Sequence, residues 1–476
     1  MQQPQAQPAE KFSEKFTDHA VNGVNPTEQT ADFVAAHRTE DVRQLALKAK
    51  RVEGLDLPLA LDQIAGWQIA CKKLPQWASC EGIIYPPHIS MEQCSSQFTA
   101  QYKSEIAQTL LTPAVTVRAR MSDSAESDNQ TTKSEPQLSD SGESDNCEVE
   151  MCLRMSDSPE SDTLVARSSM VDLTGGFGVD FSYLARGFSQ ATYVERQRHL
   201  CDLAEHNMAA LGLDQARIVC GDGVEYLRQM DPVDFIYLDP ARRDEHGSRT
   251  YAIEDCTPNV FELRDLLLAK SQYTLVKLSP MLDWRKAVAD FDGTVREVHI
   301  VATGNECKEL LLVLGQQMHE EPSAPRVFCV NDNQRIDYDS AAYTQGLRIG
   351  GKPLPEVKNY LYEPNASIMK AGCFDLVEER FGVTQVGPSS HLFVSATPVA
   401  DFSGRGFAIE EIGGMNKKDI KRLLNGTKQA NIAVRNFPLT APQLRKKLKL
   451  ADGGPVYLFG TTMQGCDHVL LRTSKI

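Results

Sequence analysis

Residues 170–180 read Met-Val-Asp-Leu-Thr-Gly-Gly-Phe-Gly-Val-Asp, an apolar run that leads into a glycine turn. Glycine lets the backbone turn sharply and approach a ligand closely, and the amino end of a following helix attracts negative charge. A single turn of this kind is often only tight packing between a strand and a helix. The stretch therefore predicts the first strand and turn of an α/β domain, and on its own it is a weak indication of a site.

Three further acidic residues follow later apolar runs in the same region. Glu195 comes after Tyr193-Val194, Asp222 after Cys220-Gly221, and Asp239 directly after residues 235–238. The carboxyl ends of parallel strands form one edge of a sheet, and ligands bind at that edge. Glu195 or Asp222 alone would be interpreted as a helix N-cap. The order and spacing of the acids, with Asp172 as the first, favour a ligand site instead.

The region around these acids alternates between strand-like and helix-like segments. Helices are expected over 181–186 and 198–211, and strands over 170–173, 191–195, 216–220, 234–238, 273–278, 295–301 and 309–314. Such alternation predicts a parallel sheet that is covered by helices on both faces. We therefore expect a Rossmann-like α/β domain over residues 167–318.

The other parts of the chain differ in composition. Residues 1–30 are polar and predict a flexible tail, and residues 31–117 predict a helical domain. In that domain Ser90 is expected to start a helix that runs through Phe98, Tyr102 and Ile106. Residues 118–166 are an acidic low-complexity segment, predicted to be a disordered insertion. An irregular α+β connecting region is expected over 319–400. A basic α+β domain is expected over 401–476, with helices at 417–424 and 441–448 and strands at 429–435, 455–461 and 468–472.

Charge is distributed unevenly along the 476 residues, which carry a formal net charge of −14. Residues 121–166 hold twelve acids and two bases, whereas residues 402–476 hold thirteen bases and five acids. A basic domain can bind a polyanion even within an acidic chain. The acidic serine repeats are interpreted as a tolerated loop expansion, with nucleic-acid mimicry or phosphorylation as the alternatives.

Several classes of protein are disfavoured by what the sequence lacks. No apolar run approaches the roughly 20 residues of a membrane-spanning helix, and the first residues do not resemble a signal peptide. The twelve cysteines show no CxxC pair and no Cys/His ligand spacing. We expect a cytoplasmic protein with reduced thiols and no metal site.

The sequence resembles the class I S-adenosylmethionine-dependent methyltransferases. The resemblance is carried by residues 172–178, Glu195, Asp222 and the motif Asp239-Pro240-Ala241-Arg242. More narrowly, the chain resembles bacterial methyltransferases with a THUMP-like C-terminal domain, through residues 37–43, 91–96, 304–309, 362–365 and 430–435. One departure is Thr174, which stands where the first glycine of the methyltransferase loop is usual.

The resemblance implies a role for each site residue. S-adenosyl-L-methionine would lie with its amino-acid part over the loop, its ribose on Glu195 and its adenine near Asp222. Asp239, Pro240 and Arg242 would face the methyl acceptor. The loop residues implied in cofactor binding are Asp172, Thr174, Gly175, Gly176 and Gly178. The THUMP-like domain implies RNA as the partner, in particular ribosomal or transfer RNA.

The motif at Asp239 is related to the Asp/Asn-Pro-Pro-aromatic tetrad that orients an exocyclic base amine. Arg242 replaces the aromatic residue, and a guanidinium can stack on a base or hold a phosphate. Methylation at carbon normally needs a cysteine nucleophile. In some such enzymes that cysteine follows the next strand, where this chain has Ser279. Cys256 and Cys307 remain candidates, although each is better interpreted as a buried apolar cysteine. A nitrogen acceptor is therefore favoured.

Two other functions are considered. One is a non-catalytic RNA-binding protein that retains a methyltransferase fold. The other is a nicotinamide-dependent oxidoreductase, which is disfavoured because Phe181 stands where the third glycine of a dinucleotide fingerprint belongs.

Overall fold

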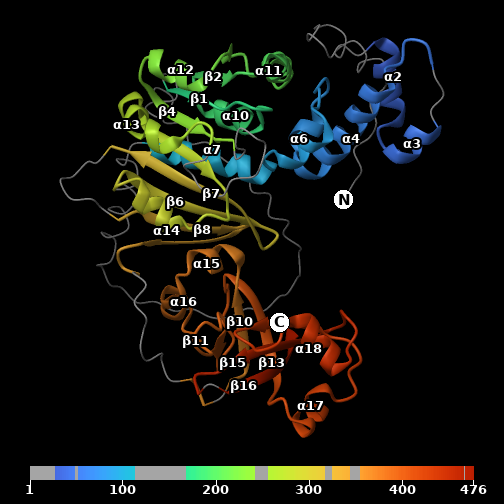
Figure 1. Ribbon diagram of the computed structural model, residues 1–476, viewed down its shortest axis with the longest axis vertical. Helices are drawn as coiled ribbons and strands as arrows, with labels where there is room; N and C mark the ends of the chain where they lie inside the picture. The colour runs from blue at the N-terminus through green and yellow to red at the C-terminus, as the bar shows by residue number, and fades with distance from the viewer. Residues whose placement is uncertain are drawn as a thin grey trace, which may run out of the picture. The chain divides into compact units, whose positions relative to one another are not determined.

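The computed structural model describes residues 27–48, 52–112, 168–241, 256–316, 324–343, 354–356, 358–465 and 467–476. The chain divides into two compact units, Met1–Ile236 and Tyr237–Ile476, with the boundary inside strand β4 (Val233–Leu238). Figure 1 shows the elements of both units. The predicted acidic insertion and Arg242 lie outside the described residues.

Helices make up the first part of the first unit: α2 (Glu28–His37), α3 (Val42–Lys48), α4 (Leu57–Lys73), α5 (Pro75–Ser79), α6 (His88–Gln93) and α7 (Gln97–Leu111). Helix α2 begins inside the segment predicted to be a flexible tail, so that prediction is wrong for its last residues. The hydroxyl of Thr27 caps α2 by accepting a hydrogen bond from the Thr30 amide at 3.2 Å. The Thr30 hydroxyl in turn accepts one from the Asp56 amide at 3.0 Å, which ties α2 to the start of α4.

The helix expected to run from Ser90 to Ile106 is interrupted. Ser90 lies within α6, which ends before an extended Cys94, and a new helix begins after Ser96. The Ser96 hydroxyl accepts a hydrogen bond from the Thr99 amide at 3.2 Å and so caps α7. Two serines compete for the role of N-cap in this segment, and the break places Ser95 against the neighbouring helix α10 (Val179–Leu184), where its hydroxyl bonds Asp180.

The central sheet has nine strands in the order β3-β2-β1-β4-β5-β7-β6-β8-β9. The remaining bounds are β1 (Ser169–Asp172), β2 (Gln190–Glu195), β3 (Ala216–Cys220), β5 (Ser271–Leu278), β6 (Val295–Thr303), β7 (Glu306–Gly315), β8 (Arg326–Asn331) and β9 (Gln334–Asp339). The helices that alternate with these strands are α10, the short 3₁₀ helix η1 (Ala185–Gly187), α11 (Arg198–Ala210), α12 (Gly223–Gln229), α13 (Val260–Lys270) and α14 (Trp284–Asp290).

The prediction of a parallel sheet holds for the first strands and fails for β7. Strands β1, β2 and β3 pair in parallel, but β7 is antiparallel to both β5 and β6. Gly304 and Asn305 form the two-residue connection between β6 and β7, with φ angles of 58° and 62°. Positive φ at both positions is the backbone of the tight hairpin turns that glycine and asparagine favour.

The sheet continues beyond the expected boundary at residue 318. Strand β8 pairs in parallel with β6, and β9 pairs antiparallel with β8. The connecting region predicted over 319–400 is therefore divided, because its first strands extend the central sheet and its later ones join a second sheet. Backbone pairing decides this membership, and the short apolar runs of the region do not reveal which neighbour each strand selects.

The second sheet has seven strands in the order β11-β12-β10-β13-β16-β15-β14. Its strands are β10 (Tyr360–Pro364), β11 (Thr384–Gln385), β12 (Phe393–Ser395), β13 (Gly404–Gly413), β14 (Asn431–Arg435), β15 (Val456–Thr462) and β16 (His468–Lys475). Its helices are α15 (Ala366–Ala371), α16 (Phe374–Phe381), α17 (Lys417–Leu424) and α18 (Ala441–Leu448). The predicted helices at 417–424 and 441–448 are confirmed in both bounds.

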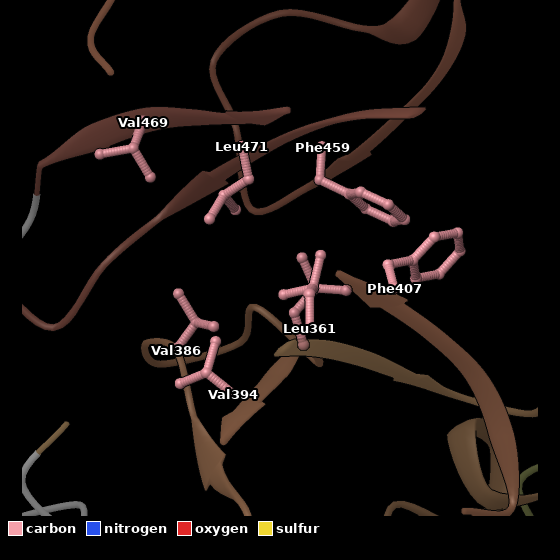
Figure 2. Packing of buried hydrophobic residues seen from close by; sticks show 8 residues of the cluster. Leu361, Val386, Val394, Phe407, Phe459, Val469 and Leu471 are labelled. Carbon is pink, nitrogen blue, oxygen red and sulfur yellow. The ribbon is translucent and has the colours of Figure 1, made fainter. Parts of the chain in front are cut away.

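Each face of this sheet buries its own apolar cluster. On one face, Leu361, Val394 and Phe407 face Phe459 and Leu471, as Figure 2 shows. On the other face, leucines of α17 and α18 pack against Leu458 and Leu470. Because successive side chains of a strand point to opposite faces, Leu458 and Phe459 belong to different clusters.

Candidate active site

The glycine loop after β1 is tied to the end of β2 by backbone hydrogen bonds. Asp172, the last residue of β1, is 1% exposed, and its Oδ1 accepts a hydrogen bond from the Thr174 amide at 2.9 Å. The Gly175 amide donates to the Val194 carbonyl at 2.9 Å, and the Gly176 amide donates to Glu195 Oε2 at 3.1 Å. The structure thus brings together the predicted residues Asp172, Thr174, Gly175, Gly176 and Glu195.

Glycine is required at these positions for two different reasons. A Cβ atom at residue 175 would lie 2.2 Å from the ring of Tyr193, which fills the space beneath the loop. Gly176 and Gly178 have φ angles of +55° and +82°, where other residues are strained. The Tyr193 hydroxyl donates a hydrogen bond to the Gly176 carbonyl, and burial raises the pKa of Tyr193, so the hydroxyl remains a donor. Sequence analysis missed Tyr193, which reads as an ordinary strand residue.

Glu195 presents a carboxylate at the end of β2. Besides accepting from Gly176, it accepts a hydrogen bond on Oε1 from the Gln197 amide at 2.9 Å. A carboxylate offers about four lone-pair positions, and the side chain is only half-buried. Glu195 therefore keeps the capacity to accept hydrogen bonds from a pair of ribose hydroxyls.

Asp222 follows β3 and caps helix α12. Its Oδ1 accepts hydrogen bonds from the amides of Val224 and Glu225 at 2.9 and 3.0 Å. A Cβ atom at the next residue, Gly223, would lie 2.2 Å from the Leu173 carbonyl oxygen, so the start of α12 packs closely against the end of β1. The N-cap interpretation holds for Oδ1. Asp222 is exposed, and its role in binding adenine stays a prediction.

The N-terminal helices support the glycine loop from outside the sheet, a role that sequence analysis did not predict. The Trp77 indole donates to the Ser182 hydroxyl at 3.1 Å, and its ring lies 5.0 Å from that of Phe177. Helix α7 packs along α10 (Figure 1). There the fully buried Lys103 forms an ion pair with Asp180 at 3.1 Å. A removed or misplaced α7 would leave the helix after the glycine loop without these partners.

In the second unit, Asp239 belongs to a cluster of charged groups. It directly follows β4, and its Oδ2 lies 2.6 Å from Lys277 Nζ on β5. The same ammonium lies 3.9 Å from Oε1 of Glu309 on β7, whose side chain is 5% exposed. Pro240 is buried, and Ala241 pairs with Thr257 through two backbone hydrogen bonds of 2.8 and 3.0 Å. The predicted site residue Arg242 lies outside the described residues.

Lys277 and Glu309 were not predicted as site residues, although the sequence contains a signal for both. Lys277 interrupts the mostly apolar strand residues 274–278, and Glu309 begins the otherwise apolar run 309–314. Charged side chains are rarely buried unless they are paired. Two such interruptions in neighbouring strands therefore indicate a buried ion pair, which the sheet order β4-β5-β7 makes possible.

The candidate cysteine nucleophiles are buried or half-buried. Burial raises the pKa of the Cys307 thiol, which donates to the Ala366 carbonyl at 3.2 Å. Cys256 is 7% exposed. Ser279, at the position of the cysteine in carbon methyltransferases, is buried, and its hydroxyl accepts a hydrogen bond from the Met281 amide at 3.3 Å.

Among the described residues, no group of three or more His, Cys, Asp or Glu side chains is arranged to hold a metal ion. None of the helices in the part of the chain that the structure describes has the length and apolar character needed to cross a membrane.

The C-terminal part of the chain matches two known protein families. Residues 404–475 match a family described as THUMP domain-like, and residues 360–402 match one described as a ferredoxin-like domain. A crystal structure of a "putative methyltransferase" from Porphyromonas gingivalis W83 is 29% identical, with a TM-score of 0.72, over 94% of this chain and 97% of that one. A comparison with curated protein sequences gave no match.

Other solved structures match about a third of the chain. An S-adenosylmethionine-dependent methyltransferase from Agrobacterium tumefaciens is 17% identical over 32% of this chain and 56% of that one, with a TM-score of 0.25. An O-methyltransferase from Bacillus cereus in complex with SAH is 13% identical over 32% and 76%, also with a TM-score of 0.25. The chain therefore has an α/β fold like that of the P. gingivalis protein, with a helical N-terminal region and a THUMP-like domain at its carboxyl end.

Proposed function

We propose that this protein is an S-adenosylmethionine-dependent methyltransferase that acts on RNA. The observation that carries the proposal is the bond between the Gly176 amide and the Glu195 carboxylate. It joins the glycine loop after β1 to the acid at the end of β2, which are the two elements that a class I methyltransferase uses to bind its cofactor. The similarity to the P. gingivalis protein over nearly the whole chain supports the same conclusion.

The residues present fit S-adenosylmethionine. Gly176 has a positive φ, and a Cβ atom there would meet only open space and a backbone oxygen at 3.7 Å. Glu195 would accept hydrogen bonds from the ribose hydroxyls. Asp222 would lie beside the adenine. Its cap to helix α12 uses Oδ1, and no hydrogen bond to Oδ2 is found among the described residues, so Oδ2 can accept one from the adenine amino group. When bound, the cofactor supplies a methyl group on a positively charged sulfur.

Asp239 is proposed to orient the methyl acceptor. The ammonium of Lys277 holds one of its carboxylate oxygens at 2.6 Å, which fixes the side chain at the end of β4. A carboxylate held in this way accepts a hydrogen bond from an amine and leaves the nitrogen lone pair free to attack. Catalysis would then come mainly from orientation. The serine at position 279, the burial of Cys256 and the raised pKa of Cys307 support a nitrogen acceptor over carbon.

RNA is proposed as the substrate because of the C-terminal domain. Its thirteen bases exceed its five acids, and lysines on α17 and α18 are exposed, namely Lys417, Lys418, Lys421, Lys446 and Lys447. The match to the THUMP-like family supports an RNA ligand. In solution these exposed lysines would release counterions from phosphates, so binding would weaken steeply with salt.

The test is a transfer assay with methyl-labelled S-adenosylmethionine and total RNA from cells that lack this gene. The wild-type protein is expected to label one RNA species, and Asp239→Ala to label none while still binding the cofactor. Nucleoside analysis would identify the acceptor atom. Cofactor binding without label in any RNA would contradict an RNA methyltransferase. RNA binding without transfer would instead support a non-catalytic RNA-binding protein.

A further inference from the structure

We propose that Arg405 and Arg435 form a phosphate-binding site for RNA, braced by the buried Glu363 at one end of the seven-stranded sheet. The inference rests on the proposed RNA substrate and names a specific contact for it. The site is separate from the exposed lysines of α17 and α18. Those two helices cover one face of the sheet, and the cluster around Leu361 and Phe407 lies on the other face.

Glu363 brings the two arginines together. It lies on β10, directly opposite Arg405 of β13 in the strand register, and its side chain is 3% exposed. Its Oε2 accepts hydrogen bonds from Nε and Nη2 of Arg405, the first at 3.0 Å. Its Oε1 accepts one from Arg435 Nη2 at 2.8 Å. A single buried carboxylate thus holds both guanidinium groups in defined orientations.

Both arginines keep donors for a ligand. Each guanidinium has five N–H donors, and the bonds to Glu363, together with one from Arg435 to the Val434 carbonyl at 3.2 Å, occupy two on each. The Arg405 and Arg435 side chains are 43% and 39% exposed. Surface arginines are usually flexible, whereas these two are held before any ligand arrives. A preorganised guanidinium loses less rotamer entropy when it binds.

Charge and chemistry both point to phosphate. Two guanidinium groups and one carboxylate leave a net charge of +1, which matches the single negative charge of a phosphodiester. Planar guanidinium donors fit the paired oxygens of a phosphate better than a lysine ammonium does. Arg435 also contributes, after burial, to the lowered pKa of the nearby His391.

The neighbourhood of Arg435 is closely packed. Asn436 donates to the Pro388 carbonyl at 2.8 Å, and this holds the end of β14 against the loop that contains His391. A Cβ atom at Gly387 would lie 2.4 Å from the Thr462 carbonyl oxygen, so the loop packs directly on the end of β15. Beside Arg435 in the strand register is the fully buried Thr461. Contacts from two strand ends and one loop therefore support the position of Arg435.

The experiment measures binding of the full-length protein to total transfer RNA and to a labelled oligouridylate over a range of salt concentrations. For Arg405→Gln and Arg435→Gln, we expect about a tenfold loss of affinity, and the slope of log K against log salt should become shallower by about 1. Lys286→Gln is the matched control, because it removes one positive charge from a side chain that is 70% exposed on α14. It should leave both quantities unchanged.

Because Arg→Gln leaves Glu363 less well paired, a second variant preserves the ion pair. Arg435→Lys keeps the charge and is expected to retain the thermal unfolding midpoint and the salt slope, while the affinity falls several-fold because the planar fork is lost. If all three arginine variants bind RNA like Lys286→Gln, the phosphate site is wrong, and the proposed methyltransferase function is unaffected. If the wild-type protein binds neither RNA, both the site and the RNA substrate are wrong, and cofactor binding then shows whether the methyltransferase assignment survives.

Discussion

The glycine loop and the cluster around Asp239 are built in opposite ways. The loop site is made of backbone amides and of acids that follow one another closely along the chain, from Asp172 to Glu195. The cluster includes, among the described residues, the side chains of Asp239, Lys277 and Glu309, which meet because β4, β5 and β7 are neighbours in the sheet. The first site is therefore readable from a local pattern, whereas the second depends on strand pairing.

The difference also separates two kinds of fragility. Every residue except proline has a backbone amide, so most substitutions keep the hydrogen-bond donors of the loop. The loop conformation is instead sensitive to substitutions whose Cβ atom would clash with a neighbour. The Asp239 cluster depends on the pairing of charged side chains, one of which, Glu309, is almost completely buried. Variants in the two regions should thus lose function for different physical reasons.

The largest effect is expected at Asp239. Asp239→Ala should lower kcat for RNA methylation by roughly 100-fold or more, since an oriented hydrogen-bond acceptor is lost at the reacting group. The affinity for S-adenosylmethionine, measured by calorimetry, should stay within about twofold. If the affinity for S-adenosylmethionine fell as much as kcat, Asp239 would not act separately from the cofactor-binding loop.

Lys277→Met should destabilise the protein by about 3 kcal/mol, because it leaves the carboxylates of Asp239 and Glu309 without their shared cation. Lys308→Met is the matched control: its partner Glu306 lies 2.7 Å away, but the two side chains are 41% and 73% exposed. Exposed pairs contribute at most about 1 kcal/mol. Chemical denaturation of both variants tests the prediction, and equal losses would contradict a special role for Lys277.

Gly223→Ala should destabilise the protein by about 1–3 kcal/mol, because the added methyl group meets the Leu173 carbonyl oxygen, a backbone atom that has little room to move. Cofactor affinity should fall with it. Gly221→Ala, two residues earlier, adds a methyl group into open space, and it should change the free energy of unfolding by about 0.5 kcal/mol or less. If the two substitutions change the free energy of unfolding equally, the close contact between Gly223 and Leu173 does not contribute to stability.

The smallest effect concerns pH. Burial lowers the pKa of His299 below its usual 6.5, against the opposing influence of Glu297. Below pH 6.5, His299 is therefore protonated in the unfolded chain but remains neutral in the folded chain. The free energy of unfolding should fall as the solution is acidified. Because His391 contributes with the same sign, the measurement is the difference between wild type and His299→Gln in melts from pH 7.5 to 5. The difference should change only on the acid side.

Much of the architecture was predictable from periodicity. The alternation of apolar runs gave the strands β1 to β7 within a few residues, and α17 and α18 in full. The hairpin between β6 and β7 has a local signal in the sequence, since Gly304-Asn305 is a pair that favours a two-residue turn. A two-residue turn joins antiparallel strands, so this pair is inconsistent with a parallel β7.

The N-terminal helices were predicted as helices, but their function was not. Ser90 and Ser96 are equally acceptable N-caps by type, and only the contact of α7 with α10 favours the break between them. Likewise, a lysine in a helical pattern reads as solvent-exposed, whereas Lys103 is fully buried against Asp180. No local rule identifies such a pair.

By itself, the sequence determined the strands, the glycine turn and the acids at strand ends, because side-chain period, backbone freedom and charge are properties of short segments. Only the tertiary structure decided that β8 and β9 extend the central sheet, that Lys277 reaches Asp239, and that Glu363 joins Arg405 to Arg435. Strand pairing and buried charge balance connect residues that are tens of positions apart. Which partners are chosen depends on the free energy of the whole packed arrangement.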